Sequence, residues 1–166
     1  HGWSLGEKEN WRKFALWEEP TRTVFIWKAP GVTAPGGLCA RPVDYASIYP
    51  TLCALAGIPA PAHLEGADIT SLLRDPGAEW KLPAVTTWLK GNHAVRTEDW
   101  RYIRYADGTE ELYHDAADPL EYVNLAAKPE YADVLARHRA HLPKTAAPEP
   151  STIKPRHRAA KQKKRK

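Results

Sequence analysis

The chain has 166 residues, enough for one domain, and its 43% hydrophobic and 27% charged residues are typical of a globular protein. The formal net charge of +4 is unevenly spread, because residues 144–166 hold nine Lys or Arg against one acid and so carry +8. Residues 1–143 therefore carry −4, which excludes a globular body that binds nucleic acid through a basic surface.

Two cysteines, Cys39 and Cys53, are too few for a disulfide framework and lack the Cys-x-x-Cys spacing of a metal or redox site. They allow one bridge or two thiols, and we expect free thiols. No run of apolar residues approaches the roughly 18 that a membrane span needs, so we expect no membrane partner.

The first part of the chain alternates Gly- and Pro-rich loops with short predicted elements. Residues 11–18 have helical character, and the predicted helix ends at Pro20, which a helix interior does not accept. Residues 22–27 are β-branched or aromatic on both faces, which predicts a strand buried inside a parallel sheet.

A longer helix is predicted before Gly57, because apolar residues recur there at helical spacing. Pro50 fits this helix if Ser47 is the N-cap and Pro50 falls in the first turn, where backbone donors lack partners. Gly57 suits the left-handed residue that ends a helix. Asp68 is predicted to cap a further short helix over residues 68–74.

From residue 84 onward the pattern changes to short strands, and turn signals at residues 90–92 and 106–108 separate them. They predict a small antiparallel sheet. A predicted helix follows Pro129, and the chain from residue 143 onward is predicted to be disordered because Pro, Ala, Lys and Arg dominate it. The predicted strands cover residues 84–89, 93–97, 101–105 and 111–113, and the helix covers residues 130–141, with Tyr131, Val134, Leu135 and His138 on one face.

Five motifs, in this order along the chain, resemble the C-terminal part of type I sulfatases, which belong to the alkaline-phosphatase-like superfamily. Residues 1–13, HGWSLGEKENWRK, resemble most the iduronate-2-sulfatase-like branch, in which an Asp precedes the His and the motif ends in Trp-x-Lys. The other four motifs are the strand-like segment at 23–30, the helix at 41–57, the strands at 95–105, and the segment at 111–125 with its Asp-Pro and Asn-Leu pairs.

The resemblance implies an α/β fold, the C-terminal portion of an alkaline-phosphatase-like sulfatase with a small antiparallel sheet and a C-terminal helix. In this interpretation residues 1–83 are the C-terminal part of the sulfatase α/β core. Residues 84–142 are an antiparallel sheet and helix subdomain, and residues 143–166 are a disordered basic tail.

The resemblance also implies a function for the intact parent protein: metal-assisted hydrolysis of a sulfate ester on a sulfated sugar or polysaccharide. A sulfate ester is negatively charged, and its cleavage adds charge to the leaving oxygen, so the site needs a cation and positive donors. Calcium is the usual metal of the family, and His1 matches the second member of its Asp-His metal pair. Lys13 matches the lysine that binds sulfate and helps the leaving group.

His93 follows a turn at the start of a predicted strand, and it is a candidate substrate contact or else a structural histidine. Arg96 is expected to be an ion-pair partner within the sheet, and Lys8 is expected to lie on the surface. Relatives of this family are usually exported.

The chain departs from the family at the nucleophile, a formylglycine made from Cys or Ser in a C-x-P-S-R-like signature. Cys39 precedes Ala-Arg-Pro and Cys53 precedes Ala-Leu-Ala, so neither fits. The nucleophile and the paired acidic metal ligands are expected in a missing N-terminal half, and we expect this chain alone to be inactive. It is also expected to be marginally stable, with residues 84–142 its best-folded part, because the apolar residues 23–27 lack neighbours.

Two alternatives stay open from the sequence. One is a phosphatase or phosphodiesterase of the same superfamily, which the nature of the nucleophile would distinguish. The other is a non-catalytic remnant whose basic tail binds nucleic acid, since residues 154–166 hold eight Lys or Arg and no acid. Such tails are more often solvated extensions, which makes nucleic acid an unexpected partner.

Overall fold

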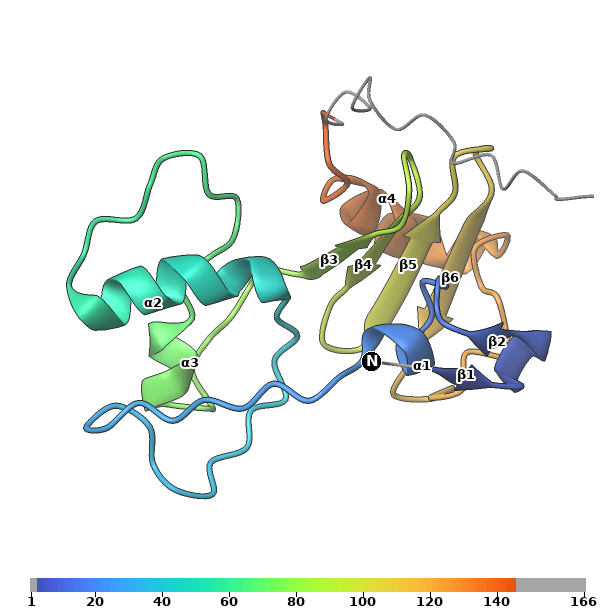
Figure 1. Ribbon diagram of the computed structural model, residues 1–166. Helices are drawn as coiled ribbons and strands as arrows, with labels where there is room; N and C mark the ends of the chain where they lie inside the picture. Colours follow the sequence, from blue (N-terminus) through green and yellow to red (C-terminus); the bar gives the residue numbers. More distant parts are fainter. Residues whose placement is uncertain (1–2, 146–166) are drawn as a thin grey trace, which may run out of the picture.

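Four antiparallel strands form the larger of two sheets in the computed structural model, which describes residues 3–145 (Figure 1). The strands are neighbours both in sequence and in space, as the alternation of short apolar runs and turns predicts. The predicted antiparallel sheet is confirmed. Its strands are β3 (Ala84–Thr87), β4 (His93–Arg96), β5 (Trp100–Arg104) and β6 (Glu110–His114).

One face of this sheet packs against the C-terminal helix. Alternation along the strands places Val95, Tyr102 and Leu112 on this face, and all three are fully buried. Leu135 of α4 (Ala132–Arg139) packs against them, and a 3-10 turn, η3 (Pro129–Tyr131), precedes the helix. The predicted helix is thus confirmed.

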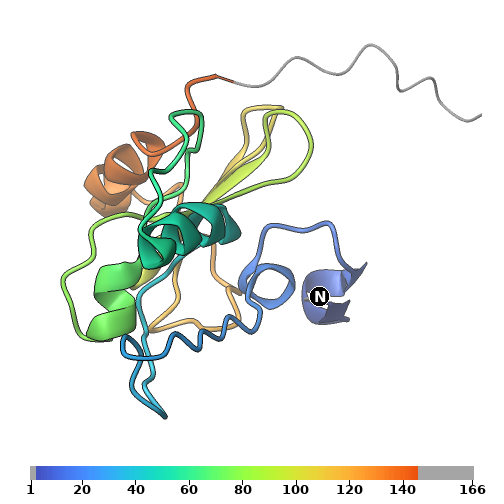
Figure 2. The same cartoon turned by 60° about the vertical axis from the view of Figure 1, so that its left-hand side comes forward.

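The opposite face of the sheet is covered by the N-terminal segment. Leu16 is buried there against Ala94, Ile103 and Tyr113. Figure 2 shows this segment and α4 on opposite sides of the strands. The segment contains β1 (Ser4–Leu5), η1 (Glu7–Glu9), β2 (Trp11–Arg12) and α1 (Glu18–Thr21), with β1 and β2 forming an antiparallel pair.

The helix predicted over residues 11–18 is wrong, because Trp11–Arg12 form strand β2 and the helix begins only at Glu18. Pro20 does not end a helix but lies third in α1. A proline is accepted there because the backbone donors of a first turn have no acceptor within the helix.

The strand predicted over residues 22–27 is also wrong in this structure. The segment runs away from the sheet without a strand beside it among the described residues (Figure 1). Val24 is 74% exposed and Ile26 83% exposed, whereas the rings of Phe25 and Trp27 contact each other. The apolar pattern is that of a buried strand, but a strand also needs backbone partners.

The helix predicted before Gly57 is confirmed as α2 (Ile48–Ala56), which follows η2 (Tyr45–Ser47). Pro50 lies in its first turn, and Gly57 is left-handed at φ 66, with the Ile58 amide donating to Cys53 at 2.9 Å. Ser47 makes no side-chain cap, so that detail was wrong.

Helix α3 (Thr70–Arg74) confirms the helix predicted after Asp68, whose carboxylate accepts a 2.8 Å hydrogen bond from the Thr70 amide. It is joined to α2 by the buried Thr51 hydroxyl, which accepts from the Ile69 amide at 3.1 Å and donates to the Ser47 carbonyl at 2.6 Å.

Cys39 is exposed and Cys53 is buried, and both are free thiols, as expected. Apart from residues 143–145, the predicted disordered tail lies outside the described residues, and so does His1. None of the helices within residues 3–145 is long and apolar enough to cross a membrane.

Candidate functional site

Lys13 lies between β2 and α1 and lines an open cleft of ≈ 1310 Å³. Its lining includes Phe14 and Glu18 from the same segment and Arg96 and Arg101 from the sheet. Ligand pockets usually measure about 300–1,000 Å³. The cleft is therefore large enough to receive a sizeable group beside Lys13.

The backbone on both sides of Lys13 is strained. Arg12 has φ 87 and Phe14 has φ 77, a left-handed region that residues with a Cβ seldom adopt. Each such residue costs of order 1–3 kcal/mol and persists only where surrounding contacts hold it. The conformation of Lys13 thus depends on anchors elsewhere in the segment.

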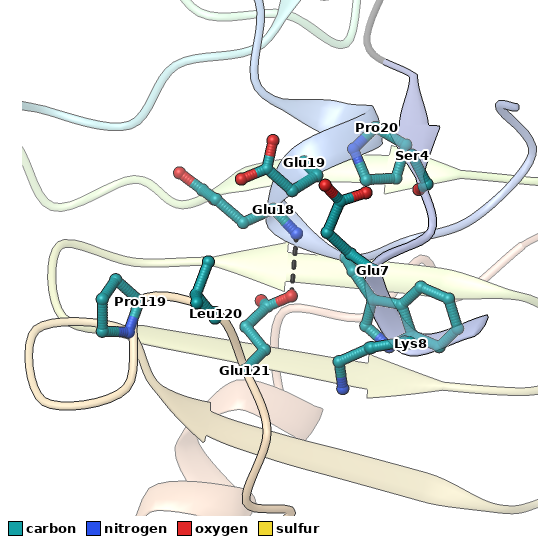
Figure 3. A pocket seen from close by; sticks show the side chains of 10 residues that line it. Ser4, Glu7, Lys8, Glu18, Glu19, Pro20, Pro119, Leu120 and Glu121 are labelled. Carbon is teal, nitrogen blue, oxygen red and sulfur yellow. Dashed lines mark hydrogen bonds between the residues drawn. The ribbon is translucent and has the colours of Figure 1, made fainter. Parts of the chain in front are cut away.

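Residues 16–18 provide these anchors on the sheet. Leu16 is 1% exposed, and its carbonyl accepts a hydrogen bond from Arg101 Nη1 at 3.1 Å. Trp17 Nε1 donates to Glu111 Oε2 at 2.7 Å. The amide of Glu18 donates to Glu121 Oε2 at 2.8 Å, an interaction drawn in Figure 3.

A cluster of buried charges lies beneath these anchors. Arg101 and Glu121 are each only 2% exposed, and Arg101 Nε lies 2.6 Å from Glu121 Oε1. That contact is a close approach of charges without hydrogen-bond geometry. Arg101 Nη2 also pairs with the Glu18 carboxylate, while Arg96 Nε lies 3.3 Å from Glu18 and 2.7 Å from Asp115. The predicted role of Arg96 as an ion-pair partner is confirmed.

The carboxylates of this cluster titrate differently because their surroundings differ. Burial raises the pKa of Glu121 to about 7, against the opposing effect of Arg101. Burial likewise raises the pKa of Asp115. Burial also acts to raise the pKa of Glu18, but the guanidinium groups of Arg101 and Arg96 hold it below its ordinary value.

Lys8, expected at the surface, is instead half-buried in this cluster, and that prediction was wrong. Its Nζ donates to Tyr113 Oη at 2.7 Å and lies 4.1 Å from the centre of the Tyr113 ring and 5.0 Å from that of Trp17. Burial lowers its pKa. No local signal reveals this contact, because Tyr113 follows 105 residues later.

A small pocket beside Lys8 and Glu121 has a volume of about 10 Å³ (Figure 3). This is room for roughly one water molecule, so a substrate does not fit there. The wider cleft beside Lys13 is the candidate site.

His93 lies on the other face of the sheet. Alternation along β4 places it with Val95, on the side that α4 covers, whereas Ala94 and Arg96 face the N-terminal segment. Its Nδ1 lies 2.9 Å from the Thr87 hydroxyl, and burial lowers its pKa. The fold does not bring His93 and Lys13 together on one face.

The described part of the chain does not form a metal site of its own. No three His, Cys, Asp or Glu side chains converge within residues 3–145. The carboxylates of Glu18, Asp115 and Glu121 each lie against the guanidinium group of Arg96 or Arg101. His1, the predicted metal ligand, lies outside these residues.

Comparison with known proteins gives a family match over most of the chain. The sequence model of the family described as N-sulphoglucosamine sulphohydrolase, C-terminal, matches residues 6–147. A sulfatase of Formosa agariphila is 39% identical over 147 residues, 89% of this chain and 29% of that protein. The Delta 4,5-hexuronate-2-O-sulfatase of Bacteroides thetaiotaomicron is 33% identical over 146 residues, 79% of this chain and 30% of that protein.

A solved structure of Bacteroides fragilis yidJ, assigned as a sulfatase, superimposes with a TM-score of 0.70 at 21% sequence identity. The likeness covers 83% of this chain and 32% of that chain, and at this identity it shows a shared fold alone. The chain thus spans less than a third of the length of each of these three proteins.

Proposed function

Because this chain belongs to the family of N-sulphoglucosamine sulphohydrolase C-terminal domains, we propose that it is the C-terminal part of a sulfatase, a sulfuric ester hydrolase. The expected α/β fold with a small antiparallel sheet is confirmed by the structural likeness. The proposed division is the one that the sequence suggests: residues 1–83 in the sulfatase core, 84–142 as a subdomain, and 143–166 as a tail.

The observation that supports this function best is the placement of Lys13. It lines the cleft on a segment whose following residues are anchored to the sheet. An ammonium group is a compact charge that can stabilise the oxygens of a sulfate group and the charge that develops on the leaving oxygen. Lys13 is therefore the proposed substrate-binding and catalytic group of this chain.

The proposed substrate is a sulfated saccharide, and the proposed branch is the iduronate-2-sulfatase-like one. Residues 1–13 resemble the motif of that branch. The hexuronate-2-O-sulfatase of Bacteroides thetaiotaomicron, at 33% identity, supports an ester at position 2 of a uronate. Contact between His93 and the substrate stays a prediction, and His93 does not share a face with the anchored segment.

In the proposed parent protein, a formylglycine would supply the nucleophile and calcium would neutralise the charge of the sulfate group. We propose that residues beyond this chain supply the formylglycine and most of the calcium ligands. His1 is then the one metal ligand that this chain contributes. The part played by this chain is then to bind the ester and to hold the Lys13 ammonium beside it. We also propose, from the family resemblance alone, that the parent is exported.

The test is inorganic sulfate release from a 2-O-sulfated uronate disaccharide by the parent protein and its Lys13→Ala variant. Loss of a positive group aimed at developing charge should lower kcat by about 10²–10³-fold. Lys90→Ala, which removes an exposed lysine in the turn before β4, is the matched control and should keep the wild-type rate. Equal rates for Lys13→Ala and Lys90→Ala would show that Lys13 has no part in the reaction.

A further inference from the structure

We propose that the buried residues Arg101 and Glu121 are positioning residues: they fix the orientation of Lys13 in the cleft. The inference rests on the function proposed for Lys13. It concerns two buried side chains that act through the backbone of residues 16–18.

Arg101 directs its guanidinium group at three parts of the structure. Nη1 donates to the Leu16 carbonyl at 3.1 Å, Nη2 pairs with the Glu18 carboxylate, and Nε lies 2.6 Å from Glu121. The planar fork of an arginine suits such a fixed arrangement, whereas a lysine has a single charged atom. Arg101 thus ties the segment that carries Lys13 to strand β5.

Glu121 completes the link from the other side. It lies in the loop after β6 and is 2% exposed. Its carboxylate accepts a hydrogen bond from the Glu18 amide at 2.8 Å. Figure 3 shows its carboxylate reaching from this loop toward the backbone at the start of α1. Its own backbone is left-handed at φ 56, a costly conformation for a glutamate. The loop is thus held in a strained form that brings this carboxylate to the segment.

The strain around Lys13 explains why such a link is needed. Arg12 and Phe14, at φ 87 and φ 77, would relax to ordinary backbone conformations if residues 16–18 were released. Relaxation on either side of Lys13 would shift the backbone that carries its side chain. The contacts of Arg101 and Glu121 therefore set where the ammonium group points.

A buried ion pair is a poor way to gain stability alone, because desolvation of both charges offsets most of their attraction. Apolar packing is the alternative to a buried ion pair. On the other face of the sheet, Val95, Tyr102 and Leu112 pack in this way with apolar side chains of α4 and its flanks. The near-complete burial of Arg101 and Glu121 beside the backbone of residues 16–18 favours a geometric role for this pair.

The experiment compares the parent protein with its Arg101→Lys and Glu110→Gln variants. Arg101→Lys keeps the charge but loses the fork, so kcat should fall at least tenfold while KM changes less than twofold. Hydrogen exchange of the 13–18 backbone should become faster, with strands β5 and β6 unchanged. Glu110→Gln removes a similar ion-pair cluster from the α4 face, and it should lower Tm without changing kcat.

Glu121→Gln keeps the side-chain shape but removes the negative charge that faces Arg101 Nε, so it should also lower kcat, and it serves as the test if Arg101→Lys does not fold. The proposal is overturned if both Arg101→Lys and Glu121→Gln keep the wild-type kcat while Lys13→Ala loses it. It is equally overturned if Glu110→Gln lowers kcat as much as Arg101→Lys does at the same loss of Tm. An unchanged rate in Lys13→Ala would instead refute the proposed function.

Discussion

Glu110, the first residue of β6, accepts hydrogen bonds from three side chains on the face that α4 covers. Its Oε1 accepts hydrogen bonds from Tyr102 Oη at 2.6 Å, from Arg139 Nε at 2.8 Å and from Arg104 Nη1 at 3.2 Å. Chiefly because Arg139 donates to it, the pKa of Glu110 falls from 4.5 to about 2. A single carboxylate thereby ties the C-terminal helix to two strands.

Glu110→Gln should lower the free energy of unfolding by about 1–2 kcal/mol at pH 7, because charge-assisted hydrogen bonds are lost. Since the folded pKa lies below the unfolded value, this stabilisation is present above pH 4.5 and is lost as pH falls toward 2. Urea denaturation of both chains at pH 7 and pH 2.5 measures the difference. A difference as large at pH 2.5 as at pH 7 would contradict this account of Glu110.

Gly66 determines how the loop after α2 passes over the start of that helix. A Cβ added at Gly66 would lie 2.0 Å from the Ala46 carbonyl oxygen and 2.7 Å from the Ser47 amide nitrogen. These are backbone atoms that cannot rotate away. At Gly37, by contrast, an added Cβ would meet only ordinary contacts, the nearest at 3.4 Å from a Pro76 side-chain carbon.

Gly66→Ala should therefore destabilise the chain by about 2 kcal/mol or more, in the range of overpacked sites, because the loop must shift to relieve the clash. Gly37→Ala should change stability by less than about 0.5 kcal/mol. Thermal denaturation followed by circular dichroism compares the two. Equal Tm values for both variants would show that the approach of Gly66 to Ala46 is not a fixed feature of the fold.

The elements that the sequence predicts well are those that local rules determine. Strands β3 to β6, the end of α2 at Gly57 and the apolar face of α4 all follow from periodicity and turn residues. The wrong predictions depend on neighbours, because residues 22–27 have a strand pattern without a strand partner among residues 3–145. Arg101 and Glu121 could not be paired with Glu18 from sequence, since more than 80 residues separate them from it.

At the scale of the whole molecule, the two halves of the described chain differ in how well they bury apolar side chains. Both apolar clusters form around strands β4, β5 and β6. In the earlier segments Ile26 and Leu38 are 83% and 92% exposed. Together with a length below a third of its relatives, this supports the proposal that the chain completes its site only within a larger sulfatase.

We propose that this chain supplies part of a sulfatase active centre and not the whole of it. The most direct measurement is inorganic sulfate release from a sulfated uronate disaccharide by the 166-residue chain and by the parent protein, assayed side by side at equal concentration. Release by the parent with none by the chain alone is the predicted result. Release by the chain at a rate comparable to that of the parent would contradict the account.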